Sequence, residues 1–398
     1  MTSLRILILV SSYLPAYKAG GPVRTISNMV DQLGKIFDFW ILTGDRDYQD
    51  SHSFDSVPLR KWLPVGHSQV YYVDPASLSL LSLRALIDEV KPDIVYLNSL
   101  FSLLANKYLF VRRMGMIPQI PTIAVPRGTF SSGALQLKRL KKQTYLLAAR
   151  GSDFYKGLYW QASSKAEKED IHAILPCVAE EKIFVAPDLV VMAQGNGEVS
   201  DWTEIGRQTT KEPGQVHLIY LSRIKPVKNL KFALTLLPSL KGQIKFDLFG
   251  PVQDQDYWDD CQEIIKNLPP HIQVQYHGPV PNEEVRKIFS DAQFLLLPTL
   301  GESFGHVILE SLQAGCPVLI SDRTPWDDLS KEMAGWVIPL EENNRWIETI
   351  QSCIDMGQES FIMLSNNAAQ YAMHWLGSSD ALQVNRDMFL SVAAKLVK

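Results

Sequence analysis

The feature that most constrains the fold is an alternation of short aliphatic runs with longer amphipathic segments, which recurs along the chain. The run over residues 4–10 is typical of a strand buried on both faces of a sheet, and a helical pattern follows it over residues 22–33. Further strands are predicted at 39–43, 70–73, 93–97, 122–125 and 157–162, and further helices at 78–90, 103–114 and 133–149. Strands that alternate with helices in this way predict a mostly parallel, doubly wound sheet.

The alternation stops between residues 192 and 214, where Gly, Asn, Glu, Thr and Gln are frequent, and then starts again. The second series predicts strands at 216–221, 244–249, 272–276, 294–297 and 317–320, helices at 230–240, 256–267 and 282–292, and a helical tail from residue 359. We therefore predict an α/β protein with two Rossmann-like, doubly wound parallel-sheet domains that face a cleft. The predicted parts are an N-terminal domain (1–190), a linker (191–214), a C-terminal domain (215–375) and a final helix (376–398) that packs back on the N-terminal domain.

Composition narrows the class of protein. The 398 residues are 46% hydrophobic and 21% charged, which suffices for two cores, and 39 basic against 43 acidic residues argue against a nucleic-acid partner. The four cysteines are scattered and include no C-x-x-C pair, so the sequence fits neither a disulfide-bonded scaffold nor a zinc site. The apolar run near the N-terminus is too short for a signal segment or a membrane span, so we expect a cytoplasmic protein.

A glycine-flanked acidic turn after the predicted strand 294–297 carries the strongest functional signal. In the stretch 301–305, Gly-Glu-Ser-Phe-Gly, the glycines permit a tight strand-to-helix turn, and Ser303 is predicted to cap the helix that follows. The start of a helix binds anions such as phosphate. Glu310 follows Glu302 by eight residues, which predicts carboxylates on the order of 10 Å apart on either side of that anion site. A sugar linked through a diphosphate to a ribose presents hydroxyls, phosphates and hydroxyls in the same order.

A basic loop is predicted at the same sheet edge. Arg223 and Lys228 follow the first strand of the second series, and together a planar guanidinium and an ammonium neutralise a diphosphate without a metal ion. Two simpler interpretations stay open: Glu302 and Glu310 as solvated residues, and Arg223 as the partner of a local carboxylate.

Three stretches of the second half resemble the family 4 glycosyltransferases, which are retaining enzymes of the two-domain GT-B fold. They are Leu-Ser-Arg-x4-Lys-Asn at 221–229, Tyr-His-Gly-Pro-Val at 276–280 and Gly-Glu-Ser-Phe-Gly-x4-Glu-Ser-x2-Ala-Gly-Cys-Pro-Val at 301–318. The resemblance implies that Arg223 and Lys228 hold the donor diphosphate, that Glu302 meets the donor sugar and that Glu310 meets the ribose. It also places Gly278 and Val280 near the base, and Ser303, Phe304 and Gly305 in backbone contact with sugar or phosphate.

The first half of the chain carries the acceptor-side candidates. The Gly-Gly pair that ends at Gly21 stands at the start of the first predicted helix. The resemblance implies that Gly21 touches the donor diphosphate. The alternative is that the pair forms a turn with a structural role alone. Asn98 stands in a stretch where the family often has histidines, and Arg127 stands where it commonly has an active-site histidine. An arginine is a fixed cation and cannot act as a base, so we expect Arg127 to stabilise phosphate charge or to bind an anionic acceptor.

One segment has a marked charge bias. Residues 94–152 contain nine Lys or Arg and no Asp or Glu, and the cations Lys138, Arg139, Lys141 and Lys142 are clustered in a predicted helix. Such a helix suits an anionic membrane surface or a lipid-diphosphate acceptor, which would place the protein at the inner membrane face. A solvated helix face explains the pattern equally well.

These features together predict a glycosyltransferase that moves a sugar from a nucleotide-sugar donor to a sugar or lipid-linked hydroxyl acceptor, with retention and without metal or other cofactor. The predicted catalytic set is Glu302, Arg223, Lys228 and Arg127. The tripeptides at 324–326 and 335–337 resemble a subgroup that assembles cell-surface polysaccharides. Two rivals stay open: a noncatalytic nucleotide-sugar-binding subunit, and a glycoside hydrolase, whose two carboxylates would stand about 5–9.5 Å apart.

Overall fold

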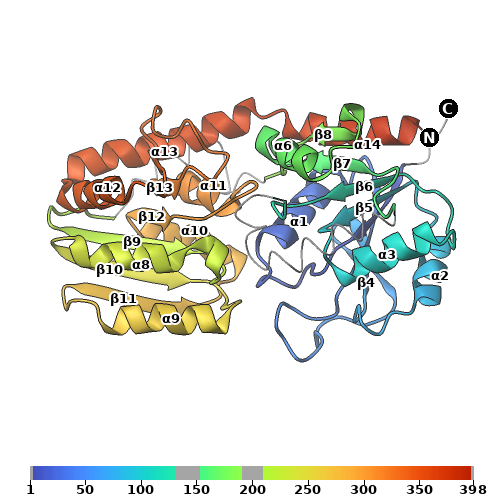
Figure 1. The fold of residues 1–398 in the computed structure, drawn as a ribbon, viewed down its shortest axis with the longest axis horizontal. Helices are drawn as coiled ribbons and strands as arrows, with labels where there is room; N and C mark the ends of the chain where they lie inside the picture. The colour runs from blue at the N-terminus through green and yellow to red at the C-terminus, as the bar shows by residue number, and fades with distance from the viewer. Residues whose placement is uncertain (1–2, 131–152, 191–208, 396–398) are drawn as a thin grey trace. The chain divides into compact units, whose positions relative to one another are not determined.

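The computed structural model describes residues 3–130, 153–190 and 209–395, and the chain forms two compact units (Figure 1). Unit 1 comprises Met1–Val190 and Asp380–Lys398, and unit 2 comprises Val191–Ser379. The helix predicted over 133–149, with its four clustered cations, lies outside the described residues.

Unit 1 is built on an eight-stranded sheet with the strand order β3-β4-β2-β1-β5-β6-β7-β8. Its strands are β1 (Arg5–Leu9), β2 (Asp38–Thr43), β3 (Trp62–Val65), β4 (Ser68–Tyr72), β5 (Ile94–Asn98), β6 (Thr122–Val125), β7 (Tyr159–Ala162) and β8 (Ile183–Val185). Its described helices are α1 (Gly21–Leu33), α2 (Leu80–Val90), α3 (Leu103–Arg113), α6 (Lys165–Ile174) and α14 (Ala381–Ala394), with a 3-10 turn at Glu180–Lys182. Within the described sheet, β3 and β4 pair antiparallel and all other neighbours pair parallel.

The aliphatic first strand is buried on both sides, as its composition predicts. Ile6 and Ile8 belong to a core cluster that also contains side chains of α1 and α14, whereas Leu7 and Leu9 belong to a second cluster with side chains of α2 and α3. Alternate residues of a strand point to opposite faces, so both faces of this sheet are covered.

The predicted helical tail is two helices rather than one. α13 (Gln358–Ser378) belongs to unit 2, and after Ser379 and Asp380 the chain starts α14, which packs into the core of unit 1. The Phe389 ring lies 5.5 Å from the Phe37 ring, edge to face.

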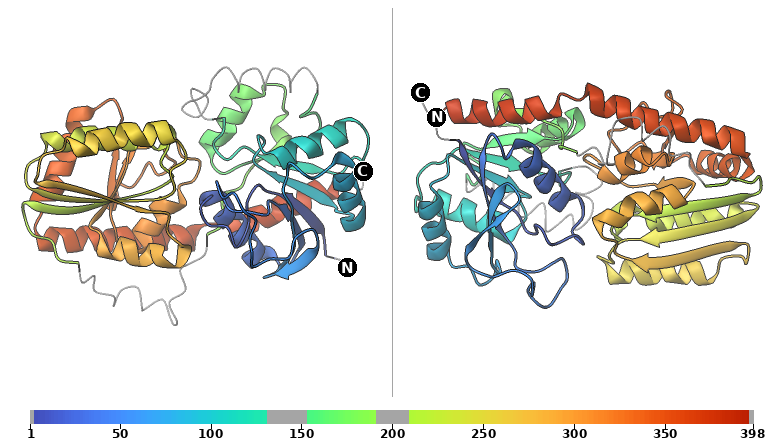
Figure 2. Two further views of the ribbon diagram at one scale, coloured as in Figure 1. Left: turned by 90° about the horizontal axis from the view of Figure 1, so that it is seen from below. Right: turned by 180° about the vertical axis from the view of Figure 1, so that it is seen from behind.

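Unit 2 has a six-stranded sheet with the order β11-β10-β9-β12-β13-β14, in which all neighbouring strands are parallel. The strands are β9 (Gln215–Leu221), β10 (Gln243–Phe249), β11 (Ile272–Gly278), β12 (Phe294–Leu297), β13 (Val318–Ser321) and β14 (Gly335–Ile338). The helices besides α13 are α8 (Leu230–Leu236), α9 (Gln255–Lys266), α10 (Asn282–Asp291), α11 (His306–Gln313) and α12 (Asn343–Asp355), with 3-10 turns at Pro226–Lys228 and Leu237–Ser239. Figure 2 shows helices of this unit on both faces of its sheet. In chain order the strands run 3-2-1-4-5-6, the order of nucleotide-binding Rossmann sheets.

The predicted α/β class with two mainly parallel sheets is confirmed. Three described strands are not predicted from the sequence: β3, which forms a short antiparallel hairpin with β4, and the edge strands β8 and β14. Among the described helices, none combines the length and the apolar character needed to span a bilayer.

Candidate functional site

The candidate site of unit 2 lies where its strand order reverses. β9 and β12 are neighbours in the sheet, but the chain leaves β9 toward α8 and leaves β12 toward α11. Loops at the carboxyl ends of two such strands diverge and leave room for a ligand. Arg223 and Lys228 stand in the loop after β9, and Glu302 stands in the loop after β12.

Hydrogen bonds hold these two loops together. The Leu300 amide donates to the Val227 carbonyl at 2.8 Å, and the Thr299 hydroxyl donates to the same carbonyl at 3.0 Å. The neighbouring Lys228 is thereby brought to the start of the acidic turn. The sequence analysis placed both segments at one sheet edge, and the structure brings them into direct contact.

Lys228 and Glu302 form an ion pair. The Lys228 ammonium donates to both carboxylate oxygens of Glu302, at 2.6 Å from Oε1 and also in contact with Oε2, and the side chains are only 7% and 15% exposed. Burial by itself would raise the pKa of Glu302, but the charge of Lys228, with smaller contributions from Arg223 and Lys225, outweighs burial and lowers that pKa. The carboxylate is therefore ionised at neutral pH.

Burial lowers the pKa of Lys228, while the attraction to Glu302 opposes that change. Arg223 and Lys225 are half-buried in the same loop. Lys228, Arg223 and Lys225 thus all lie close enough to the Glu302 carboxylate, at the reversal of strand order, to lower its pKa. Such a set suits a ligand with two negative phosphates.

The helix after the acidic turn begins later than predicted. α11 starts at His306 with Gly305 as its N-cap residue, so Ser303 is not the cap. Glu302 lies before the helix, so the premise that Glu302 and Glu310 share one helix axis is wrong. Glu310 is half-buried on α11 itself.

Gly305 is required by both its conformation and its surroundings. Its φ angle is +84°, and a Cβ atom added there would stand 2.9 Å from Cδ1 of Ile308 and 3.1 Å from Cγ of Glu302. The turn from Glu302 to Gly305 therefore lies tightly against the start of α11, and Phe304 is buried beneath it. The predicted anion site would lie at the first amides of this helix, and it stays a prediction.

Gly278 ends β11, and Val280 follows it half-buried. The Gly250 amide donates to the Gly278 carbonyl at 2.8 Å, and a Cβ atom at Gly250 would stand 2.0 Å from the carbonyl oxygen of Ser222. The segment predicted to face the base is thus linked, through the end of β10, to the loop that carries Arg223.

Unit 1 has its own strand-order reversal, between β1 and β5, and the acceptor-side candidates lie around it. Gly21 is the first residue of α1, after the loop that follows β1, and Asn98 is the last residue of β5. Arg127 comes two residues after the end of β6, with a positive φ angle of 54°.

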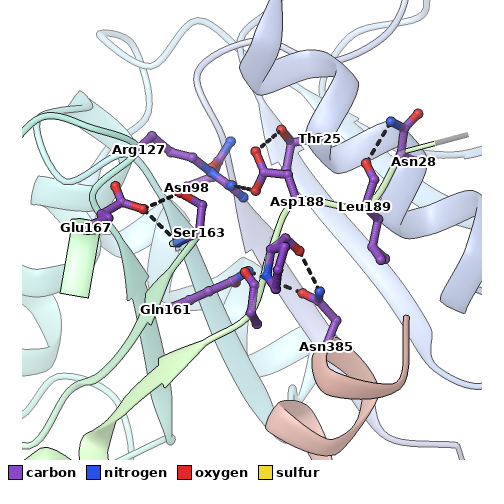
Figure 3. Close-up of polar contacts among 12 residues, drawn as sticks. Thr25, Asn28, Asn98, Arg127, Gln161, Ser163, Glu167, Asp188, Leu189 and Asn385 are labelled. Carbon is purple, nitrogen blue, oxygen red and sulfur yellow. Dashed lines mark hydrogen bonds and ion pairs between the residues drawn. The ribbon is translucent and has the colours of Figure 1, made fainter. Parts of the chain in front are cut away.

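The Arg127 guanidinium is bound inside unit 1 (Figure 3). It forms a buried ion pair with Asp188, donates from Nε to the Asn98 side-chain oxygen at 2.9 Å and donates from Nη2 to the Tyr96 hydroxyl at 2.9 Å. The Thr25 hydroxyl of α1 donates to the other Asp188 oxygen at 2.9 Å. Arg127 therefore cross-links α1, β5, β6 and the segment after β8.

The sequence points to Arg127 and Asn98 as candidates but contains no signal for Asp188. Arg127 and Asp188 are 61 positions apart in the chain, and the sequence between them contains no pattern that would pair them, so only the folded sheet shows this contact. The charge of Arg127 is compensated by Asp188, which weakens its expected role as a binding cation for phosphate.

A metal site requires several ligand side chains to lie close together. In the described ranges, no group of three or more His, Cys, Asp or Glu side chains is arranged to hold a metal ion. The Lys228–Glu302 site is instead built from cations, one carboxylate and backbone amides.

The sequence of unit 2 matches a known family. Residues 201–372 match the family model described as glycosyl transferases group 1. The chain is 28% identical over 193 residues to a D-inositol 3-phosphate glycosyltransferase of Pseudarthrobacter chlorophenolicus, an alignment that covers 42% of each chain. It is 26% identical over 115 residues to O-antigen chain mannosyltransferase B of Escherichia coli, covering 28% of this chain and 29% of that relative. The chain thus spans less than half the length of these curated relatives.

Solved structures share the fold over 98% of this chain. The crystal structure of HepE from Anabaena in complex with UDP and glucose is similar with a TM-score of 0.69 and 17% identity, over 98% of this chain and 100% of that one. At this level of identity the likeness concerns the fold. Residues 201–372 thus match the group 1 glycosyl transferases, and the chain has the fold of the GT-B glycosyltransferases.

Proposed function

We propose that the protein is a glycosyltransferase that transfers a sugar from a nucleotide-sugar donor to a hydroxyl acceptor. The observation that carries the proposal is the buried Lys228–Glu302 pair at the strand-order reversal of unit 2, beside Arg223 and the start of α11. In this proposal Arg223 and Lys228 stabilise the charge of the departing diphosphate, and Glu302 accepts hydrogen bonds from the donor sugar. Glu310 binds the ribose, and the segment from Gly278 to Val280 borders the base.

We also propose finer features of the reaction, each on its own ground. Cationic side chains and helix amides can neutralise a diphosphate by themselves, which supports a metal-independent transfer. Retention of the anomeric configuration is proposed from the resemblance to family 4. The likeness to an O-antigen mannosyltransferase supports a role in cell-surface polysaccharide synthesis. Contact with anionic membranes through residues 138–142 is a proposal based on sequence alone.

The hydrolase rival is less compatible with the site. A hydrolase needs one carboxylic acid that is protonated near neutral pH. Lys228 keeps Glu302 ionised, so Glu302 is unsuited to the role of general acid.

The proposal is tested by incubating the protein with a panel of UDP-, GDP-, ADP- and dTDP-sugars and hydroxyl acceptors, and by measuring the nucleoside diphosphate released. UDP-hexoses come first, because the HepE structure contains UDP and glucose. We expect Glu302→Gln to lower the rate by about 10²- to 10³-fold. Glu283→Gln, at an exposed site on α10, should leave the rate unchanged. Donor binding without release of nucleotide over the full panel would favour the noncatalytic rival instead.

A further inference from the structure

The segment after β13 holds the acidic turn at two points. The Glu302 amide donates to the Arg323 carbonyl at 2.9 Å, and the Trp326 indole N–H donates to the Phe304 carbonyl at 2.6 Å. These two bonds bracket the residues between Glu302 and Phe304. The turn is therefore attached to a segment that is neither of its own helix nor of the basic loop.

Trp326 also packs among aromatic side chains next to the turn. It is only 2% exposed, its ring lies 5.7 Å from the Phe304 ring, and it lies 5.2 Å from the Trp375 ring of α13. A Cβ atom added to Gly305 would stand 3.3 Å from the indole nitrogen. The indole thus contacts both of the last two residues of the turn.

We infer that Trp326 is a positioning residue for the reaction: it fixes the backbone from Glu302 to Gly305 so that the carboxylate and the first amides of α11 meet the donor. This inference rests on the proposed function for its kinetic consequences, but its structural content can be tested without a donor. In this inference Trp326 contacts the turn and acts on the donor only through it.

The physical reason is that the Phe304 carbonyl is held by a buried donor. Without the indole N–H this carbonyl loses its partner in an apolar surrounding, and the turn gains freedom to shift. Small displacements of groups that position a substrate reduce rates strongly, because the reacting geometry is narrow.

The test compares Trp326→Phe with Trp346→Phe. Trp346 is an equally buried tryptophan of unit 2 whose indole N–H donates to the Pro339 carbonyl at 3.0 Å, so it controls for the loss of a buried ring and its hydrogen bond. In amide hydrogen exchange without ligand, we expect residues 302–307 to exchange faster in Trp326→Phe than in the wild type, with no such change in Trp346→Phe. With an active donor, kcat/KM for the donor should fall about 10- to 100-fold in Trp326→Phe only.

The outcomes separate this inference from the proposed function. An inactive wild type would remove the proposed function, and the exchange experiment would still decide whether Trp326 fixes the turn. Unchanged exchange at 302–307, or equal losses of kcat/KM in both variants, would overturn the inference. Should Trp326→Phe fail to fold, 3-benzothienylalanine at position 326 keeps the ring shape, removes only the N–H donor and is judged by the same two measurements.

Discussion

At the scale of single residues, Lys228 keeps the poorly exposed carboxylate of Glu302 charged. Lys228→Met leaves Glu302 without its main cationic partner, and we expect a loss of about 3–5 kcal/mol in the free energy of unfolding at pH 7. The wild-type pair stabilises the fold above the unfolded pKa of glutamate, near ~4.3, and its contribution is lost as the pH falls through the lowered pKa of Glu302. The difference between variant and wild type should therefore shrink below about pH 4.

Urea unfolding between pH 3 and 7 measures this difference. Lys231→Met is the matched control, because Lys231 pairs with Asp260 on the surface, where both side chains are exposed. It should change stability little at any pH. A pH-independent loss in Lys228→Met would contradict the assignment of the effect to the Glu302 charge.

At the scale of elements, the junction between β12 and α11 depends on the conformation of Gly305. Gly305→Ala should lower the free energy of unfolding by about 1–3 kcal/mol, since alanine is strained at a φ of +84° and its Cβ would crowd Ile308 and Glu302. Gly377→Ala in α13 is the control, because nothing lies within 4 Å of its added Cβ, and it should be neutral or stabilising by up to about 1 kcal/mol. Equal effects of both substitutions in thermal unfolding would show that the turn is not restricted in this way.

At the scale of the whole molecule, α14 is a part of unit 1 that is separated in sequence from the rest of that unit. Phe389 is fully buried in its core, so Phe389→Ala should cost about 3–5 kcal/mol. Hydrogen exchange followed by mass spectrometry should show faster exchange in the peptides of unit 1 and little change in those of unit 2. Leu390→Ala removes a neighbouring side chain that is 38% exposed and should have a small effect. Equal destabilisation of both units by Phe389→Ala would contradict the division of the core.

Much of the fold could be predicted because buried parallel strands and amphipathic helices have distinct periods. The predicted strand 294–297 coincides with β12, and the predicted strand 216–221 differs from β9 by one residue. β3 was missed because its Trp-Leu-Pro-Val sequence lacks a clear strand period and contains proline, which is tolerated at an edge. The prediction of Ser303 as the N-cap residue of α11 was wrong, because the choice between Ser303 and Gly305 depends on how the turn packs against Ile308.

For the candidate site too, some features could be predicted from the sequence and others could not. Local sequence was enough to select Arg223, Lys228, Glu302 and Gly305 as candidates, since these charged or glycine residues follow predicted strands, and ligands bind at the carboxyl ends of parallel strands. Their separations in sequence say nothing of which charges meet, and the pairing of Lys228 with Glu302 became visible only in the folded unit.

The sequence by itself determined the alternation of strands and helices, the two parallel sheets and the residue types at the reversal of strand order. These follow from side-chain period and backbone preference, which act over a few residues. Tertiary structure decided that Asp188 neutralises Arg127, that Trp326 supports the acidic turn and that α14 completes the first core. Such contacts join residues far apart in the chain, and they form only when buried polar groups and apolar surfaces find partners in the packed molecule.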